Sequence, residues 1–203
     1  MKRMISTGLA GGAFALMFGL SAAFAQQAPT QRLSGTIAAV DGSTLTVKTR
    51  QGDVKVNLTS NATVMGVVRR TVADVKAGSY VGVGAMPQPD GSQKAIRVMI
   101  FSEPQRGSNE GHRPWTQPGS TMTNATVDTT VASVDGQVLM VKYKDGEKKI
   151  IIPPGLEIQA YVAGDKNELK PGVNILILRA TKKPDGTFEA AAVNAGRDGV
   201  VPN

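Results

Sequence analysis

The feature that most constrains this chain is an internal repeat with an offset of 94 residues. Residues 35–58 (GTIAAVDGSTLTVKTRQGDVKVNL) align without gaps on residues 129–152 (TTVASVDGQVLMVKYKDGEKKIII), with ten identities in 24 positions. A second matching segment, DVKAG at 74–78 and ELKPG at 168–172, keeps the same offset. Anchors that recur in the same order indicate two copies of one domain.

The repeat predicts one domain over residues 32–102 and a second over residues 123–197. Residues 103–122 lie between them and are rich in Gly, Pro, Ser and charged residues, which is typical of a linker. A domain of this length buries only about 60% of the surface of its unfolded chain, so each copy would be marginally stable alone. We therefore expect the two copies to share an interface, or the linker to pack on one of them.

Each copy has the pattern of short strands separated by turn residues. In the first copy, TIAAV, TLTVKT and VKVNL are separated by glycine turns and alternate between apolar and polar positions. An irregular segment follows, and then two more strands, YVGVGAM and KAIRVMIF. Five short strands with an irregular segment after the third predict an all-β protein of two tandem, five-stranded Greek-key barrels of the OB-like type. A β-sandwich is the alternative.

These segments also carry a resemblance to a known family. The first copy has GTI-x-x-VDG-x-x-LTV-x-T, DVKAG and a PDG turn, and the second has TVASVDGQVLMV, ELKPGVNILIL and PDGTFEAAAV. This pattern resembles the secreted bacterial domain of unknown function 5666. The resemblance implies an OB-like barrel in an exported protein with no established activity. The matching residues are turn and core positions, so the resemblance transfers no catalytic residue.

The first 25 residues have the pattern of a secretory signal peptide. Lys2 and Arg3 precede an apolar segment at residues 8–20, and Ala23-Phe24-Ala25 forms a small-x-small cleavage site. The sequence therefore predicts cleavage after Ala25 and a periplasmic protein, with an uncleaved anchor as the alternative. Zero cysteines exclude disulfides and thiolate metal sites, so the core alone must stabilise the fold.

Little in the composition favours an enzyme, a metal centre or a nucleic-acid-binding protein. The single histidine, His112, cannot complete a metal site alone, and the chain has no Gly-x-Ser-x-Gly elbow. Of the aromatic residues that could stack on bases, only Tyr143 lies on the hairpin where OB-type barrels bind ligands, and its alternation directs it to the core. We predict a non-enzymatic protein without a cofactor or a nucleic-acid partner, and the sequence identifies no metal-ligating residues.

The strongest electrostatic pattern lies on the hairpins formed by the second and third strands of each copy. If Gln51-Gly52 and Asp145-Gly146 are the turns, Lys48 faces Lys55 and Lys142 faces Lys149. Like charges on opposite positions are unfavourable, so their presence in both copies suggests a bound anion. The candidate anion-binding residues are Lys48, Arg50, Lys55, Lys142, Lys144 and Lys149. The alternative is a solvated face on which the lysines splay apart.

Trp115 is the one tryptophan, and it lies in the polar linker. We expect it to dock between the two domains and fix their angle, because an exposed indole would leave a large apolar surface in water. The resulting hypothesis is a periplasmic binding or scaffold protein that contacts an anionic envelope component or a protein partner. A metal-handling or stress-related accessory protein is the alternative.

Overall fold

The computed structural model describes residues 29–133 and 136–203, and these residues are mainly β-strands. The predicted signal peptide lies outside the described residues. The strands are β1 (Thr30–Asp41), β2 (Thr44–Thr49), β3 (Gly52–Arg70), β4 (Tyr80–Pro87), β5 (Gln93–Ile100), β6 (Gly111–Pro114), β7 (Thr121–Ser133), β8 (Gly136–Tyr143), β9 (Gly146–Ile152), β10 (Ile158–Ala163), β11 (Asn174–Lys182) and β12 (Phe188–Gly196). Three 3₁₀ turns are η1 (Val72–Asp74), η2 (Glu103–Gln105) and η3 (Lys166–Glu168). Within these two ranges, no helix has the length and apolar character needed to cross a membrane.

The first lobe is a closed five-stranded barrel. Its strands pair in the order β1, β2, β3, β12 and β11, and β11 returns to β1. The closing contact between β3 and β12 is parallel and runs from Val56↔Phe188 to Val67↔Gly196. The alternation of apolar and polar residues predicted that one face of these strands packs in a core. Leu45, Val47 and Val56 are all buried in this core.

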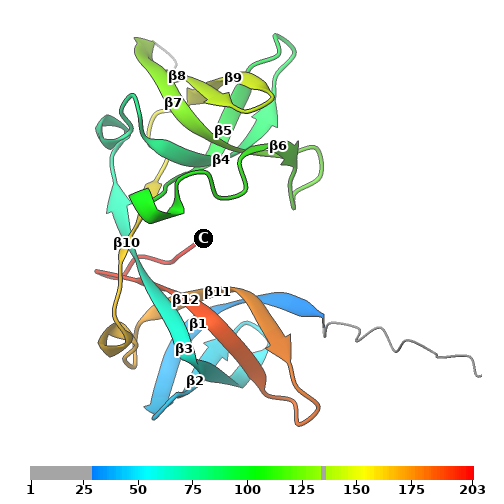
Figure 1. The fold of residues 1–203 in the computed structure, drawn as a ribbon, viewed down its shortest axis with the longest axis vertical. Helices are drawn as coiled ribbons and strands as arrows, with labels where there is room; N and C mark the ends of the chain where they lie inside the picture. Colours follow the sequence, from blue (N-terminus) through cyan, green and yellow to red (C-terminus); the bar gives the residue numbers. More distant parts are fainter. Residues whose placement is uncertain (1–28, 134–135) are drawn as a thin grey trace, which may run out of the picture.

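The second lobe contains β4, β5, β7, β8 and β9, and it lies at the other end of the molecule (Figure 1). Its circuit closes through a short parallel contact between β5 and β9, with pairs Gln93↔Ile150 and Lys94↔Ile151. The region predicted as a linker contributes η2 and β6, and β6 pairs with the edge of β7. This region is therefore packed on the second lobe.

The two lobes do not coincide with the domains predicted at residues 32–102 and 123–197. The first lobe takes three strands from the first copy and two, β11 and β12, from the second. The second lobe takes β4 and β5 from the first copy and three strands from the second. Both cores are consequently mixed: Leu45 of copy one packs in the same cluster as Ile177 of copy two, and Val83 packs with Leu139. The topology is thus an intramolecular exchange of two strands between the two predicted copies.

The exchange occurs because β3 does not turn back after it leaves the first lobe. It is 19 residues long, and its last part pairs antiparallel with β10 in the connection between the lobes (Figure 1). Val67 pairs with Tyr161, its equivalent at the offset of 94, so this contact lies on a local two-fold axis. The strand has no turn between Asn61 and Arg70. The chain therefore continues into the opposite lobe, where β4 and β5 lie.

A third cluster fills the junction around this axis. Val67, Met99, Tyr161 and Val200 are buried together, with Met65 and Phe101 packed against them. The four buried residues come from β3, β5, β10 and the C-terminal segment. The junction therefore contains an apolar core of its own.

A charged pair holds the end of β10 to the end of β12. The Arg197 guanidinium donates to both carboxylate oxygens of Glu168, at 2.9 and 2.8 Å, and to the carbonyl oxygen of Ala163. Glu168 also accepts from the backbone N–H of Asp165, which caps η3. The hydrogen bonds from Arg197 lower the pKa of Glu168 below its ordinary value.

The strand exchange predicts that neither sequence copy folds alone as a monomer. A fragment of residues 29–105 contains β1–β5 but lacks the strands that close either lobe. We expect it to be unfolded or to form an exchanged homodimer, and to form a folded 1:1 complex when mixed with residues 106–203. Size-exclusion chromatography with light scattering measures the mass of each species, and circular dichroism measures whether it is folded. A monomeric 29–105 fragment that unfolds cooperatively would contradict the exchange.

The Glu168–Arg197 pair predicts a pH-dependent part of the stability. Because the pKa of Glu168 is lower in the folded chain than its unfolded value of about 4.3, its contribution is complete above that pH and is lost as the pH falls through the folded-state pKa. Glu168→Gln should cost about 1–2 kcal/mol of unfolding free energy at pH 7. The cost should shrink at low pH in urea denaturation. An equal cost at pH 7 and pH 3 would argue against this role.

Candidate functional site

The two charged hairpins have a different register from the one predicted. The turn residues are 50–51 and 144–145, so that Thr49 pairs with Gly52 and Tyr143 with Gly146. In the first hairpin, the Thr49 side chain sets this turn, because its hydroxyl donates to the carbonyl oxygen of Gly52 and accepts from the N–H of Gln51. Each turn lies one residue earlier than predicted, so the cross-strand partner of every residue in the two hairpins changes by two positions.

The shift removes the predicted lysine–lysine pairs. Lys48 faces Asp53 rather than Lys55, and Lys142 faces Glu147 rather than Lys149. Lys142 also forms an ion pair with Asp128 at 3.1 Å. The six predicted anion-binding residues are all exposed, and they are Lys48, Arg50, Lys55, Lys142, Lys144 and Lys149. Three lie in each lobe, so the fold does not gather them into one site.

A groove of about 850 Å³ opens instead at the end of the second lobe that faces η1. It is formed where the end of β3 and η1 from the first copy meet β7, β8 and the β9–β10 connection from the second. Its lining residues are Arg69, Arg70, Thr71, Val72, Ala73, Thr130, Ala132, Gly136, Gln137, Ile152, Pro153, Pro154, Gly155, Leu156 and Glu157. Both predicted copies therefore line the groove, and neither supplies both walls.

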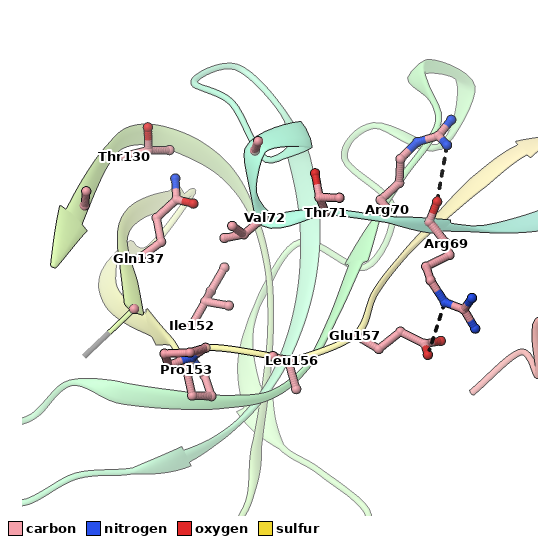
Figure 2. A pocket seen from close by; sticks show the side chains of 15 residues that line it. Arg69, Arg70, Thr71, Val72, Thr130, Gln137, Ile152, Pro153, Leu156 and Glu157 are labelled. Atoms are coloured by element: carbon pink, nitrogen blue, oxygen red, sulfur yellow. Dashed lines mark hydrogen bonds and ion pairs between the residues drawn. The ribbon is translucent and has the colours of Figure 1, made fainter. Parts of the chain in front are cut away.

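The middle of the groove is apolar and its two ends are polar. Figure 2 shows Val72 and Ile152 between the ends, with Pro153 and Leu156 along the floor of the view. Gln137 lies toward Thr130 at one end. This arrangement suits a ligand with an apolar body and polar groups at its ends.

The other end of the groove is charged. Arg69 Nε lies 3.5 Å from Glu157 Oε2, and the remaining oxygen of Glu157 accepts from the Gln159 side-chain amide at 2.9 Å. The same amide donates to the carbonyl oxygen of Val201 in the C-terminal segment. Arg70 also lies at this end. The charged lining residues are therefore two cations, Arg69 and Arg70, and one carboxylate, Glu157.

The first lobe has an equivalent opening that is nearly closed. Its cavity is about 150 Å³ and is lined by η3 and by the β1–β2 turn. Lys166, the equivalent of Val72, extends across this opening and donates from Nζ to the carbonyl oxygen of Ser60 at 2.9 Å. The two copies therefore differ at the same place in the fold: one opening is bridged by a lysine, and the other is wide and apolar.

Two local changes in the second copy widen its opening. Val47 lies ten positions after its strand partner Ile37, whereas Val141 lies 14 positions after its partner Val127, so the β7–β8 hairpin is four residues longer. The ungapped alignment matches Val131 with Ile37. Ile37 is buried, whereas Val131 lies in the longer part of the hairpin and is 60% exposed. The extended hairpin includes Thr130, Ala132 and Gln137, which form one wall of the groove.

The second change is Pro153-Pro154-Gly155, which stands where the first copy has Thr59-Ser60-Asn61. Proline cannot donate to a sheet ladder, so β9 ends at Ile152 while the equivalent β3 continues. The residues of the groove were not predicted from the sequence. The substitution of Pro-Pro-Gly within an otherwise matching repeat was the available signal.

His112 and Trp115 are both packed on the second lobe. His112 Nδ1 is 2.8 Å from the hydroxyl of Thr123, and its ring stacks on Tyr143 with centroids 6.4 Å apart. Burial, and then the charge of Lys148, lower the pKa of His112. Within residues 29–133 and 136–203, no group of three or more His, Asp or Glu side chains is placed to hold a metal ion.

Trp115 lies over Gly84 of β4, with the guanidinium of Arg97 5.8 Å from its ring centroid. It lines a cleft to which Arg32 of the first lobe also contributes. Its printed contacts, Gly84 and Arg97, both belong to the second lobe, and docking of the indole between the two domains stays a prediction.

Comparison of the chain with protein-family models, curated proteins and solved structures gives no match. The resemblance to the domain of unknown function 5666 stays a prediction from the sequence.

The contact between Trp115 and Gly84 predicts a specific effect of a methyl group. A Cβ on Gly84 would lie 2.5 Å from the indole, so Gly84→Ala must displace the ring. We expect about 1–3 kcal/mol of destabilisation and a shift of Trp115 fluorescence to longer wavelength. Gly82→Ala is the matched control, because its Cβ would meet Phe101 instead. Equal emission spectra for the two variants would contradict the placement of Trp115.

Proposed function

We propose that this chain is a non-enzymatic, exported binding protein whose ligand is a small amphiphile with an apolar body and one acidic group. The groove at the end of the second lobe is the binding site. Its volume is within the range of about 300–1,000 Å³ that is usual for small-molecule sites. The apolar body would pack against Val72, Ile152 and Leu156, and the acidic group would lie near Arg69 and Arg70.

The observation that carries this proposal is the difference between the two equivalent openings. A duplicated fold begins with two identical openings, and here one is bridged by Lys166 while the other has Val72 and is more than five times larger. An apolar surface that stays open in a groove is typical of a ligand-binding site. Selection for a ligand explains why only one opening stays apolar and wide.

The wider setting of the proposal comes from the sequence. The signal-peptide pattern of residues 1–25 favours the periplasm, and the resemblance to the domain of unknown function 5666 favours two OB-like barrels in an exported protein. The two closed strand circuits are consistent with barrels of this type that have exchanged their last two strands. An anionic envelope component with an apolar part is a ligand of the proposed class.

Closing the groove should abolish binding. Val72→Lys copies the lysine of the equivalent opening, and Val72 is 39% exposed, so the variant should fold. We expect calorimetry to show decanoate binding to the wild-type chain and an affinity at least about tenfold weaker in Val72→Lys, a loss of about 1.4 kcal/mol. Val40→Lys is the matched control, because Val40 is equally exposed and lies at the first-lobe opening.

The comparison of decanoate with decanol tests the acidic group. Decanoate should bind more tightly, and Arg69→Gln together with Arg70→Gln should remove the difference. If decanoate fails to bind the wild-type chain, or binds Val72→Lys and Val40→Lys equally, the groove is not the site. If decanol binds as tightly as decanoate, the acidic part of the proposal is wrong.

A further inference from the structure

A second cleft, separate from the groove, lies between the two lobes. It has a volume of about 600 Å³. Its lining residues are Arg32, Ile96, Arg97, Trp115, Thr116, Gln117 and Asn203. Arg32 belongs to β1 of the first lobe, whereas Arg97 belongs to β5 of the second, so the cleft contains one guanidinium group from each lobe.

The side chains that line this cleft include two cations and no acidic residue. Neither Arg32 nor Arg97 takes part in any of the ion pairs formed among residues 29–133 and 136–203; the arginines that do so are Arg69, Arg106 and Arg197. Two like charges that share a cleft repel each other, and an anion bound between them is attracted to both.

Arg97 is the less solvated of the two cations. Its guanidinium lies over the ring of Trp115, and the hydroxyl of Tyr161 is close to it. Burial is the main cause that lowers the pKa of Arg97 to about 10; Tyr161 opposes the shift, and the charge of Arg32 adds to it. The group is still a cation at neutral pH, and a half-buried cation that forms no ion pair is costly.

We propose that this cleft is an oxyanion site, in which Arg32 and Arg97 together bind one phosphate or carboxylate group of a small ligand beside Trp115. The planar guanidinium group matches the geometry of both oxyanions. A ligand held by one arginine from each lobe also ties the lobes together. This site goes beyond the proposed function, because it shares no lining residue with the groove.

Trp115 reports on this site directly, because it is the only tryptophan in the chain. The full-length protein is titrated with sodium phosphate and, separately, with sodium acetate, while sodium chloride keeps the ionic strength constant. We expect a saturable change in Trp115 fluorescence and a matching isotherm by calorimetry with at least one of the two anions. The anion that binds more tightly identifies the oxyanion.

Arg32→Gln is the decisive variant, because Arg32 is exposed and its loss should not disturb the fold. It should weaken anion binding at least about tenfold. Arg179→Gln is the matched control, since Arg179 is an exposed arginine of the same lobe outside the cleft and its loss changes the net charge equally. The proposal is overturned if neither anion binds by either method, or if the two variants bind equally. In that case Arg97 packs against Trp115 and Tyr161 for a structural reason and binds no anion.

Discussion

The architecture depends on one contact, the antiparallel pairing of β3 with β10 at the junction of the lobes. Because Val67 and Tyr161 are equivalent residues that pair with each other, the two copies cross the junction side by side in opposite directions. After β3 crosses, β4 and β5 lie in the second lobe, and after β10 crosses, β11 and β12 lie in the first. The crossing accounts for the mixed cores and the junction cluster, and it places the residues that line the groove and the cleft.

The all-β class and much of the core could be predicted from local patterns. The alternation at Leu45, Val47 and Val56 is a property of one hairpin, and it holds whichever copy supplies the neighbouring strands. The exchange could not be predicted in this way, because the same side chains satisfy the exchanged and the unexchanged barrel equally well. Only the straight course of β3 from Asn61 to Arg70 distinguishes the two.

The candidate sites show a similar division. The hairpin charges were visible in the sequence, but each turn lies one residue earlier than predicted, which changed every cross-strand partner. In the first hairpin the Thr49 hydroxyl, a local detail, favours that turn. The groove needs Val72 and Ile152, which are 80 residues apart, and the cleft needs Arg32 and Arg97, which come from different lobes. A linear pattern contains no information on such distant pairs unless the exchange is already known.

The pairing of β1 with β11 has a consequence for the order of folding. Thr30 lies opposite Thr181, so the first lobe joins residues separated by 151 positions and cannot close until nearly the whole chain is present. Such long-range contacts slow folding, since a large loop must be closed before they form. A chain that emerges from a channel with its N-terminus first would therefore keep β1–β3 open until its last strands arrive. Its fold is completed by the residues that are delivered last.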